Sequence, residues 1–289
     1  MKGIILAAGK GTRLYPMTKP VCKPLLPVYD KPLIYYSIAV LMEADIRDIM
    51  IIIPPDEEET FRKLLGDGSA FGVHITYAVQ YVAHGIADAF LVAEDFVAGD
   101  SACLVLGDNI FYAKDLCEKL KQGAATQDGA TVFGYYVEDP RAFGVVEFDE
   151  HGKAISLEEK PKHPKSNYII PGLYFYDSDV LQLAKTLQPS ARGELEITDL
   201  NRLYLESGKL QVIPLASDFV WMDAGTADSL LEAAQQIKQI QQDTGRYVAC
   251  LEEIAYKHGY LSEEQVEQAG EKLNSTLYGQ YLQCISAER

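Results

Sequence analysis

The chain begins with a short apolar segment that runs directly into a glycine-rich loop. Residues 2–6 contain two isoleucines and predict a buried first strand. The loop that follows, LAAGKGTRL at positions 6–14, is built from small residues that leave main-chain N–H groups accessible. A concave run of N–H dipoles attracts anions, and Lys10 and Arg13 add positive charge beside it. The loop therefore predicts a site for a triphosphate at the end of the first strand.

Two better-known phosphate loops do not match this stretch. A Walker A loop has serine or threonine after Gly-Lys, whereas Lys10 is followed by Gly11. A dinucleotide fingerprint needs a third small residue at the position of Leu14. Taken alone, the loop could also be an ordinary glycine-rich turn after a strand.

Positive charge is concentrated around this loop in an otherwise acidic chain. The 289 residues carry a formal net charge of −16. Positions 1–42 hold six of the 26 basic residues and one of the 42 acidic residues, a net charge of +5; the remaining 20 basic and 41 acidic residues give −21. This distribution favours a small polyanion bound near the N-terminus, and it argues against nucleic acid or an anionic membrane as a partner, because both need a broad basic face.

Composition narrows the class of protein further. A hydrophobic content of 48% is ample for a large core. The five cysteines form no CxxC pair, and no apolar run approaches the roughly 20 residues of a membrane span. We expect a cytoplasmic protein with reduced thiols.

Strand and helix patterns alternate through the first 106 residues. Strands are predicted at 2–6, 47–53, 73–80 and 101–106, and helices at 32–44, with Pro32 as first residue, at 56–65 and at 86–96. This rhythm predicts an α/β fold with a doubly wound, mostly parallel sheet.

The second half of the chain shows a different pattern of predicted elements. Strands in quick succession are predicted at 130–137, 144–148, 154–157 and 169–176, with short strands at 210–214 and 219–222 and helices at 179–187 and 196–206. Inserted hairpins would make the sheet mixed. Thr226 is a natural N-cap for a helix at 228–242, and the tail is helical and polar. We therefore expect a core at 1–226 and a helical C-terminal region at 227–289.

Two aspartates follow predicted strands at the edge where open α/β sheets bind ligands. Asp108 follows the strand at 101–106, and Asp223 follows the strand at 219–222. Two carboxylates near a phosphate cluster suit Mg²⁺, which prefers oxygen ligands and shares its shell with phosphates. Either aspartate alone could be a turn residue. Lys23, after the cationic loop, is a candidate phosphate ligand.

Several motifs resemble those of one enzyme family. They are LAAGKGTRL (6–14), LLPVYDKP (25–32), VLGDN (105–109), GVVEFD (144–149), ISLEEKP (155–161), KSNY (165–168), GLYFYD (172–177), RGELEITD (192–199), WMDAGT (221–226) and YGQYL (278–282). The chain thereby resembles the glucose-1-phosphate thymidylyltransferases, a group of sugar-nucleotidyltransferases, over nearly its whole length. The resemblance implies a Rossmann-like nucleotide-diphospho-sugar transferase fold, with sugar-binding β insertions in the core. The implied reaction converts dTTP and glucose 1-phosphate into dTDP-glucose and pyrophosphate.

The resemblance also implies roles for individual residues. Around the nucleotide, Arg13 would brace the leaving pyrophosphate, Lys23 would contact phosphate at the reacting centre, and Asp108 and Asp223 would hold Mg²⁺. Substrate contacts are further implied at Leu6, Ala8, Gly9, Gly11 and Thr12, and for the thymine at Gln80 and the Gly85 backbone. On the sugar side, the implied residues are Gly144, Glu159, Lys160, Tyr174 and Trp221.

Departures from the family pattern cluster around the nucleotide. Ala8 stands in place of the usual glycine, Pro24 in place of glutamine, and Asp88 in place of glutamine. A uridylyltransferase that uses UTP therefore remains an alternative, as does a non-catalytic nucleotide-sugar sensor on the same fold. The family also implies a homotetramer and regulation by dTDP-rhamnose through the tail, although here Ala113 and Lys257 replace the usual glycine and arginine.

Overall fold

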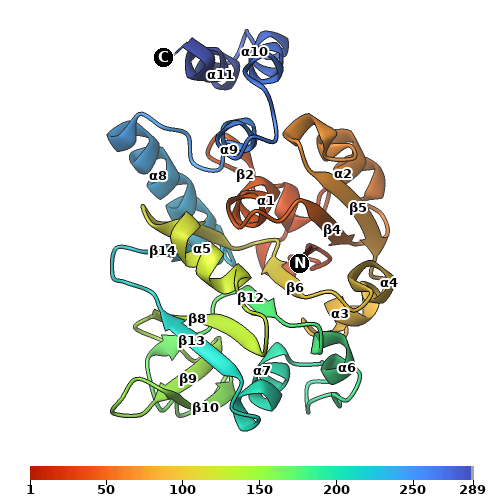
Figure 1. Ribbon diagram of the computed structural model, residues 1–289, viewed down its shortest axis with the longest axis vertical. Helices are drawn as coiled ribbons and strands as arrows, with labels where there is room; N and C mark the ends of the chain where they lie inside the picture. The colour runs from red at the N-terminus through yellow and green to blue at the C-terminus, as the bar shows by residue number, and fades with distance from the viewer. Residues whose placement is uncertain (288–289) are drawn as a thin grey trace.

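A ten-stranded mixed sheet forms the centre of the computed structural model, which describes residues 1–287 (Figure 1). The strand order is β10-β9-β11-β8-β12-β6-β1-β4-β5, and β13 pairs with β8 off this path. The strands are β1 (Lys2–Leu6), β4 (Asp48–Ile53), β5 (His74–Val79), β6 (Ala102–Leu106), β8 (Ala130–Tyr136), β9 (Gly144–Phe148), β10 (Ala154–Glu159), β11 (Tyr168–Ile169), β12 (Leu173–Tyr176) and β13 (Leu210–Pro214). This arrangement confirms the predicted α/β fold class.

The β6-β1-β4-β5 half of the sheet is parallel, and its strands β6, β1 and β4 are buried on both faces over most of their length. Strand β1 lies between β4 and β6, with Leu6 opposite both Ile52 and Leu106. Successive side chains of a strand point to opposite faces. Ile5 packs in the cluster that contains helix α1 (Ile34–Glu43), whereas Ile4 packs in the one that contains α3 (Asp88–Val92). Helices on both faces explain why β6, and β1 and β4 after their first residue, are almost entirely apolar.

The other half of the sheet is largely antiparallel. Strand β12 runs antiparallel to both β6 and β8, and β9 and β10 form a hairpin at the far edge. Helices α6 (Val180–Ala184) and α7 (Ile197–Glu206) cover this half, with α7 against β10. These are the expected β insertions, and they place a second wall opposite the cationic loop.

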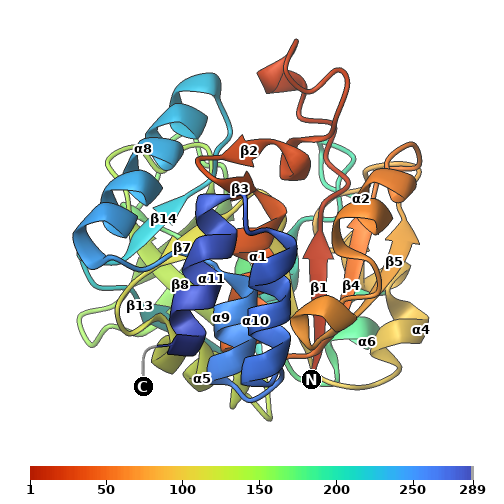
Figure 2. The same cartoon turned by 90° about the horizontal axis from the view of Figure 1, so that it is seen from above.

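The C-terminal helices pack onto the core. They are α8 (Ala227–Thr244), α9 (Leu251–Lys257), α10 (Glu263–Lys272) and α11 (Leu277–Ala287). Thr226 caps α8 as predicted, because its hydroxyl accepts a hydrogen bond from the Ser229 N–H at 3.1 Å. Helix α9 packs on α1, and α10 pairs with α11 (Figure 2). Among the described helices, none combines the length and apolarity required to cross a bilayer.

Some predicted boundaries were wrong, each for a local reason. Pro32 does not start a helix, because Lys31–Pro32 (β3) pairs with Pro27–Val28 (β2) and α1 begins at Ile34. The helix predicted at 86–96 is two helices, α3 and α4 (Glu94–Val97), which Ala93 separates with a non-helical backbone. The strand predicted at 169–176 breaks at Pro171, which has no N–H to donate; β11 and β12 both pair with β8, but the second neighbour is β9 for β11 and β6 for β12.

One further strand and one helix were not predicted. Strand β7 (Ile110–Tyr112) pairs with β14 (Val220–Met222) in a separate two-stranded sheet. Helix α5 (Leu116–Ala124) was missed; charged residues and Gly123 interrupt its short apolar stripe. Helix α2 (Glu58–Leu65) and the 3₁₀ turns η1 (Thr12–Leu14), η2 (Lys23–Leu25) and η3 (Ser69–Phe71) complete the described elements.

Candidate active site

Strand pairing brings the two aspartates together at one edge of the sheet. Asp108 lies in the turn between β6 and β7, and Asp223 directly follows β14. Because β14 runs antiparallel to β7, with Met222 opposite Ile110, residue 223 emerges beside that turn. Segments more than a hundred residues apart therefore meet next to the loop that leaves β1.

Lys23 joins these segments. Its Nζ donates to Asp108 Oδ2 at 2.6 Å and to the main-chain oxygen of Asp223 at 2.8 Å. The lysine is 6% exposed, while the Asp108 side chain is one-third exposed, at 33%. The buried cation thus holds both aspartate segments, and the carboxylate of Asp108 still faces open space.

The glycine-rich loop at 6–14 folds back toward Lys23. Gly11 has a φ of +58°, a conformation that favours glycine, and a Cβ at this residue would lie 3.2 Å from the Lys23 Cβ. The Thr18 hydroxyl donates to the main-chain oxygen of Gly11 at 2.6 Å, which fixes the turn. Arg13 makes no hydrogen bond or ion pair with any other residue in the described range 1–287, and it borders the neighbouring cavity. Its guanidinium is therefore available to an anion.

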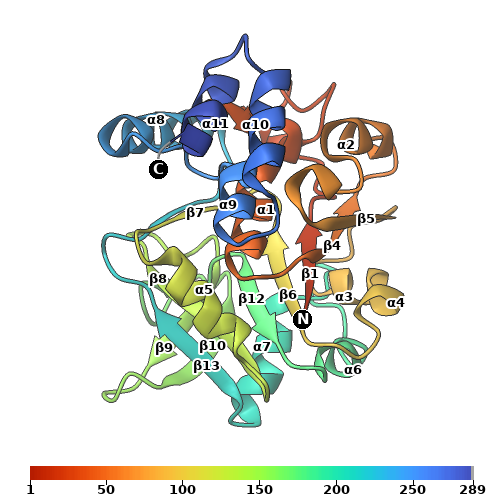
Figure 3. The same ribbon diagram turned by 45° about the horizontal axis from the view of Figure 1, so that its top comes forward.

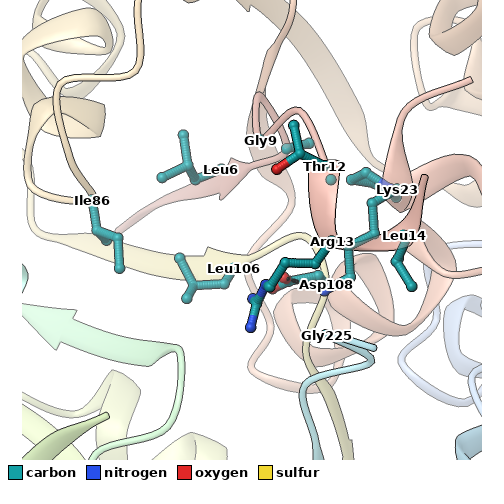
Figure 4. Close-up of a pocket in the computed structure, with 13 residues that line it drawn as sticks. Leu6, Gly9, Thr12, Arg13, Leu14, Lys23, Ile86, Leu106, Asp108 and Gly225 are labelled. Atoms are coloured by element: carbon teal, nitrogen blue, oxygen red, sulfur yellow. Dashed lines mark hydrogen bonds and ion pairs between the residues drawn. The ribbon is translucent and has the colours of Figure 1, made fainter. Parts of the chain in front are cut away.

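A cavity of about 320 Å³ lies over this loop (Figure 4). Of the residues predicted for the nucleotide, Leu6, Gly9, Gly11, Thr12, Arg13, Lys23 and Asp108 line it, together with Ala7, Leu14, Pro24, Ile86, Leu106 and Gly225. In Figure 4, Arg13 and Asp108 lie close together on the side of the cavity that is opposite Ile86. Ala8 does not line the cavity but packs in the core beneath it.

Gln80 and Gly85 do not line this cavity, although Gly85 directly precedes Ile86, which does. The Gln80 amide donates to Asp88 Oδ2 at 2.7 Å, and both residues are 8% exposed. Gly85 has a φ of +106°, and a Cβ there would lie 2.4 Å from the Leu195 carbonyl oxygen. Asp88 thus orients the Gln80 amide, and Gly85 lets its loop dock against Leu195. Base recognition by these two residues stays a prediction.

A second cavity of about 210 Å³ continues from the first. The predicted sugar-side residues Gly144, Glu159, Lys160, Tyr174 and Trp221 all line it, as does Asp223. Arg13, Ile86, Leu106 and Asp108 line both cavities. The two spaces therefore meet at Arg13 and Asp108.

One part of the wall of this second cavity is charged and held by hydrogen bonds. The Glu159 carboxylate accepts hydrogen bonds from the Thr198 hydroxyl and from Arg192 Nη2, and Lys160 Nζ lies 3.6 Å away from it. A Cβ on Gly144 would lie 2.8 Å from the Thr198 Oγ1, so only glycine leaves this space open.

Tyr174 forms part of the same wall and is 3% exposed. Burial raises the pKa of its phenol above the ordinary value, and the nearby Glu159 and Asp108 carboxylates raise it further. The hydroxyl therefore stays protonated and can donate a hydrogen bond.

The two aspartates fit a magnesium ion by their chemistry. Their carboxylates supply the hard oxygen ligands that Mg²⁺ prefers. Asp223 Oδ1 accepts from the Gly225 N–H at 3.1 Å. A Cβ on Gly225 would lie 2.9 Å from Asp223 Oδ2 and 3.3 Å from Arg13 Nη2. Because Gly225 has no side chain, space remains between the Asp223 carboxylate and the Arg13 guanidinium.

Comparison with known proteins assigns the family. The family model described as nucleotidyl transferase matches residues 2–240. The chain belongs to the nucleotidyl transferase family. The match spans both cavities and ends within α8.

Relatives within this family carry a more specific name. A glucose-1-phosphate thymidylyltransferase of Neisseria meningitidis is 55% identical over 282 residues, covering 98% of each chain, and one of Xanthomonas campestris is 54% identical, covering 99% of this chain and 97% of its own. A Bacillus anthracis crystal structure described as a glucose-1-phosphate thymidylyltransferase with sucrose superposes with a TM-score of 0.76 at 47% identity, covering 82% of this chain and 94% of its own. A UDP-glucose pyrophosphorylase complex, at 22% identity and a TM-score of 0.71, shares the fold and covers 83% of this chain and 98% of its own.

Two residues that organise this transferase site were not predicted from the sequence. Asn109 is 3% exposed; its Nδ2 donates to Asp108 Oδ1 at 2.8 Å, and its Oδ1 accepts from Trp221 Nε1 at 2.7 Å. Thr198 holds Glu159, as described above. Asn109 could have been found because it directly follows a predicted metal ligand, and Thr198 because it belongs to the RGELEITD motif.

The two residues singled out for regulation, one in the core and one in the tail, border a separate cavity of about 170 Å³. Ala113 and Lys257 both line it, with Cys250 and Tyr247. Lys257 Nζ forms an ion pair with Glu253 at 2.6 Å. Binding of dTDP-rhamnose there stays a prediction.

Proposed function

We propose that this protein is a nucleotidyltransferase that converts dTTP and glucose 1-phosphate into dTDP-glucose and pyrophosphate. A phosphate oxygen of glucose 1-phosphate forms a bond to the α-phosphorus of dTTP. The bond from that phosphorus to the α–β bridging oxygen breaks, and pyrophosphate leaves with the electron pair.

One observation carries this proposal: two cavities meet at a single charged point. The larger cavity borders the glycine-rich loop and suits a nucleoside triphosphate, and the smaller one carries charged and polar side chains that suit a sugar phosphate. Arg13 and Asp108 belong to both, and Lys23 is bonded to Asp108. A transfer between two bound substrates requires such a junction.

The protein's contribution to this reaction is placement and charge neutralisation. In-line transfer between two polyanions leaves little covalent chemistry for side chains. Lys23 and Arg13 would offset the charge that develops on the phosphates, and removal of one such donor typically costs about 3 kcal/mol of transition-state stabilisation. Asp108 and Asp223 would hold Mg²⁺, which supplies further charge neutralisation to the phosphates when bound.

The sugar side would bind the second substrate in a fixed orientation. Lys160 and the Tyr174 hydroxyl are donors that face the second cavity, and Glu159 is held as an acceptor by Thr198. We propose that these groups bind the phosphate and hydroxyls of glucose 1-phosphate. Gly144 would admit the ring.

The decisive experiment measures pyrophosphate release by the full chain with Mg²⁺, using dTTP and UTP at equal concentration against glucose 1-phosphate. We expect release with dTTP to exceed release with UTP. Greater release with UTP would replace the proposal with a uridylyltransferase. Absence of release with both nucleotides, while dTDP-glucose still binds, would identify a non-catalytic sensor.

Asp108→Asn tests the metal role. The amide keeps the shape but removes the negative charge that attracts Mg²⁺, so we expect kcat to fall by about a hundredfold or more while the circular dichroism spectrum shows the native fold. The melting temperature should fall as well, because Lys23, which is 6% exposed, loses its charged partner. Asp128→Asn is the matched control, since Asp128 is exposed and pairs with Lys209. Near-normal turnover in Asp108→Asn would contradict the assignment.

We also propose that the region 227–289 contributes to a homotetramer. Leu231 and Leu277 are large apolar side chains that are 59% and 76% exposed on α8 and α11. Light scattering on the full chain measures the mass directly; a monomer at micromolar concentration would refute this.

A cytoplasmic location is our further proposal. All five cysteines are free, and three of them are buried. Unpaired thiols are typical of a reducing compartment.

A further inference from the structure

A second group of metal-ligating side chains lies outside the proposed active site. Glu43 ends α1, Cys117 lies in α5, and His258 directly follows α9. Their ligand atoms, a carboxylate oxygen, a thiol sulfur and an imidazole nitrogen, all lie within 4.8 Å of one another. Helix α1 packs against both α5 and α9, and the three helices lie together in Figure 3. Three separate elements therefore deliver one ligand atom each to one point.

His258 is oriented for this purpose by a second carboxylate. Its Nδ1 lies 2.6 Å from Asp45 Oδ1, and its Nε2 lies 3.2 Å from Glu43 Oε2. Tyr260 donates its hydroxyl to the same Asp45 oxygen at 2.9 Å. A neutral imidazole has a single N–H, so it can donate to only one of these carboxylates. With the N–H on Nδ1, the lone pair of Nε2 and the Glu43 carboxylate face each other, and a cation between them resolves the repulsion.

This pairing of imidazole and carboxylate is a familiar feature of metal sites. Histidine ligands of metals almost always donate their other N–H to a carboxylate, a carbonyl or water, which fixes the tautomer and the ring orientation. The His258 side chain is 10% exposed, so the ring is held by its surroundings. Asp45 also lies 3.4 Å from Lys121 Nζ, which offsets its charge on the exposed side.

Cys117 completes the set without acting as a nucleophile paired with histidine. Its Sγ lies 3.5 Å from the main-chain oxygen of Glu43, to which the thiol donates. The histidine Nε2 faces the Glu43 carboxylate rather than the thiol proton. The arrangement therefore lacks the base-to-nucleophile hydrogen bond that an active thiol requires.

Distances and donor types select the kind of ion. In a tetrahedral zinc site, bond lengths of 2.0–2.3 Å place neighbouring ligand atoms about 3.5 Å apart. The 3.2 Å separation between Glu43 and His258 already matches, and the largest separation closes with a side-chain adjustment of about 1 Å. Thiolate, imidazole and carboxylate together favour Zn²⁺ over the hard ions Mg²⁺ and Ca²⁺.

We propose that Glu43, Cys117 and His258 bind one Zn²⁺-class ion, with Asp45 positioning His258. Glu43 and Cys117 also line the cavity of about 170 Å³ described above, which leaves room for water as the fourth ligand. On binding, the thiol and any proton on Nε2 lose their protons to solvent. The ion then fastens α9, and with it the C-terminal helices, to α1 and α5.

Titration of the metal-free full chain with Co²⁺ tests this site. A thiolate ligand gives cobalt a near-ultraviolet charge-transfer band that the carboxylates of the proposed active site cannot produce. We expect one equivalent of Co²⁺ to give this band in the wild type, and one equivalent of Zn²⁺ to remove it. Cys117→Ser should lose the band, whereas Cys284→Ser, which alters an exposed thiol on α11, should keep it.

Stability and activity provide independent measurements on the same variants. Zn²⁺ should raise the melting temperature of the wild type by several degrees and leave that of His258→Gln unchanged. Cys117→Ser should retain its pyrophosphate release with Mg²⁺ alone, which shows that it is folded. Absence of the cobalt band in the wild type, its persistence in Cys117→Ser, or its loss in Cys284→Ser would overturn the proposal. In that case the cluster is an ion-pair network only.

Discussion

Two buried lysines near the N-terminus have opposite surroundings. Lys23 is 6% exposed and bonds to Asp108 at the edge of a cavity. Lys31 is 4% exposed, and it lines none of the three cavities described above. It bonds to Asp30 at 2.5 Å and lies within 6.0 Å of three ring centroids, those of Tyr36, Tyr247 and Tyr278. The first lysine therefore faces space for a ligand, and the second anchors the C-terminal helices.

This difference corrects the argument from charge. All six basic residues of positions 1–42 were counted toward one polyanion site. The structure places Lys2 in an ion pair with Asp48 and Lys31 in a closed cluster, so neither serves that site. Arg13 and Lys23 are the two of the six that line the cavity in the described range. A local excess of charge indicates where cations are, but only packing decides what they face.

The largest effect should come from Lys23→Met. Loss of the cation that faces the cavity should lower kcat by about a hundredfold. Stability should change less, because Asp108 is one-third exposed and can be hydrated once its partner is gone. Steady-state pyrophosphate release and urea denaturation separate the two effects. A large loss of stability with normal turnover would reverse the proposed contrast between the lysines.

Lys31→Met should show the opposite pattern. The substitution leaves Asp30, at 18% side-chain exposure, without its cation, and removal of one partner from a buried pair costs about 3–5 kcal/mol. We expect a lower midpoint of urea denaturation and normal kcat for the folded fraction. If kcat falls as far as in Lys23→Met, then the two sites are coupled and the comparison fails.

The pH dependence of stability offers a smaller test of the closed cluster. Burial raises the pKa of Glu252, which accepts a hydrogen bond from Tyr278, above its ordinary value of 4.5. Between pH 4.5 and the raised pKa, the folded chain therefore keeps the Glu252 proton, whereas the unfolded chain has lost it. The contribution of Glu252 to the free energy of unfolding is thus complete below pH 4.5 and declines as pH rises through the raised pKa. Melting curves of Glu252→Gln should lack this part of the decline. If the melting temperatures of the wild type and the variant change in parallel with pH, Glu252 does not make this contribution.

The smallest effect is expected for Lys257→Met, a half-exposed lysine in the same tail. Its ion pair with Glu253 is worth about 0.3–0.5 kcal/mol, since the pair is one helical turn apart and reaches solvent. Glu253 would keep Arg246 and the Tyr281 hydroxyl as partners. Urea denaturation should detect hardly any change in the free energy of unfolding. A loss of stability comparable to that of Lys31→Met would show that exposure does not determine how much these lysines stabilise the fold.

Local patterns accounted for much of the fold. The first strand, the strand at 48–53 and the cap at Thr226 depend on residue type and near neighbours, and the structure agrees with the prediction for each. Helix α5 and strand β7 were missed because their stability comes from packing and pairing with distant segments, which short-range periodicity does not reveal.

The sequence by itself determined the family, the α/β class and which residues carry charge near the phosphate loop. Only the tertiary structure decided that Asp108, Asp223 and Lys23 meet. It also decided that Gln80 is hydrogen-bonded to Asp88, and that Lys31 pairs with Asp30 away from the phosphate loop. The same holds for the group of Glu43, Cys117 and His258, whose members are distant in sequence. The physical reason is range: strand and helix propensities act over a few residues, whereas a binding site depends on how whole elements pack.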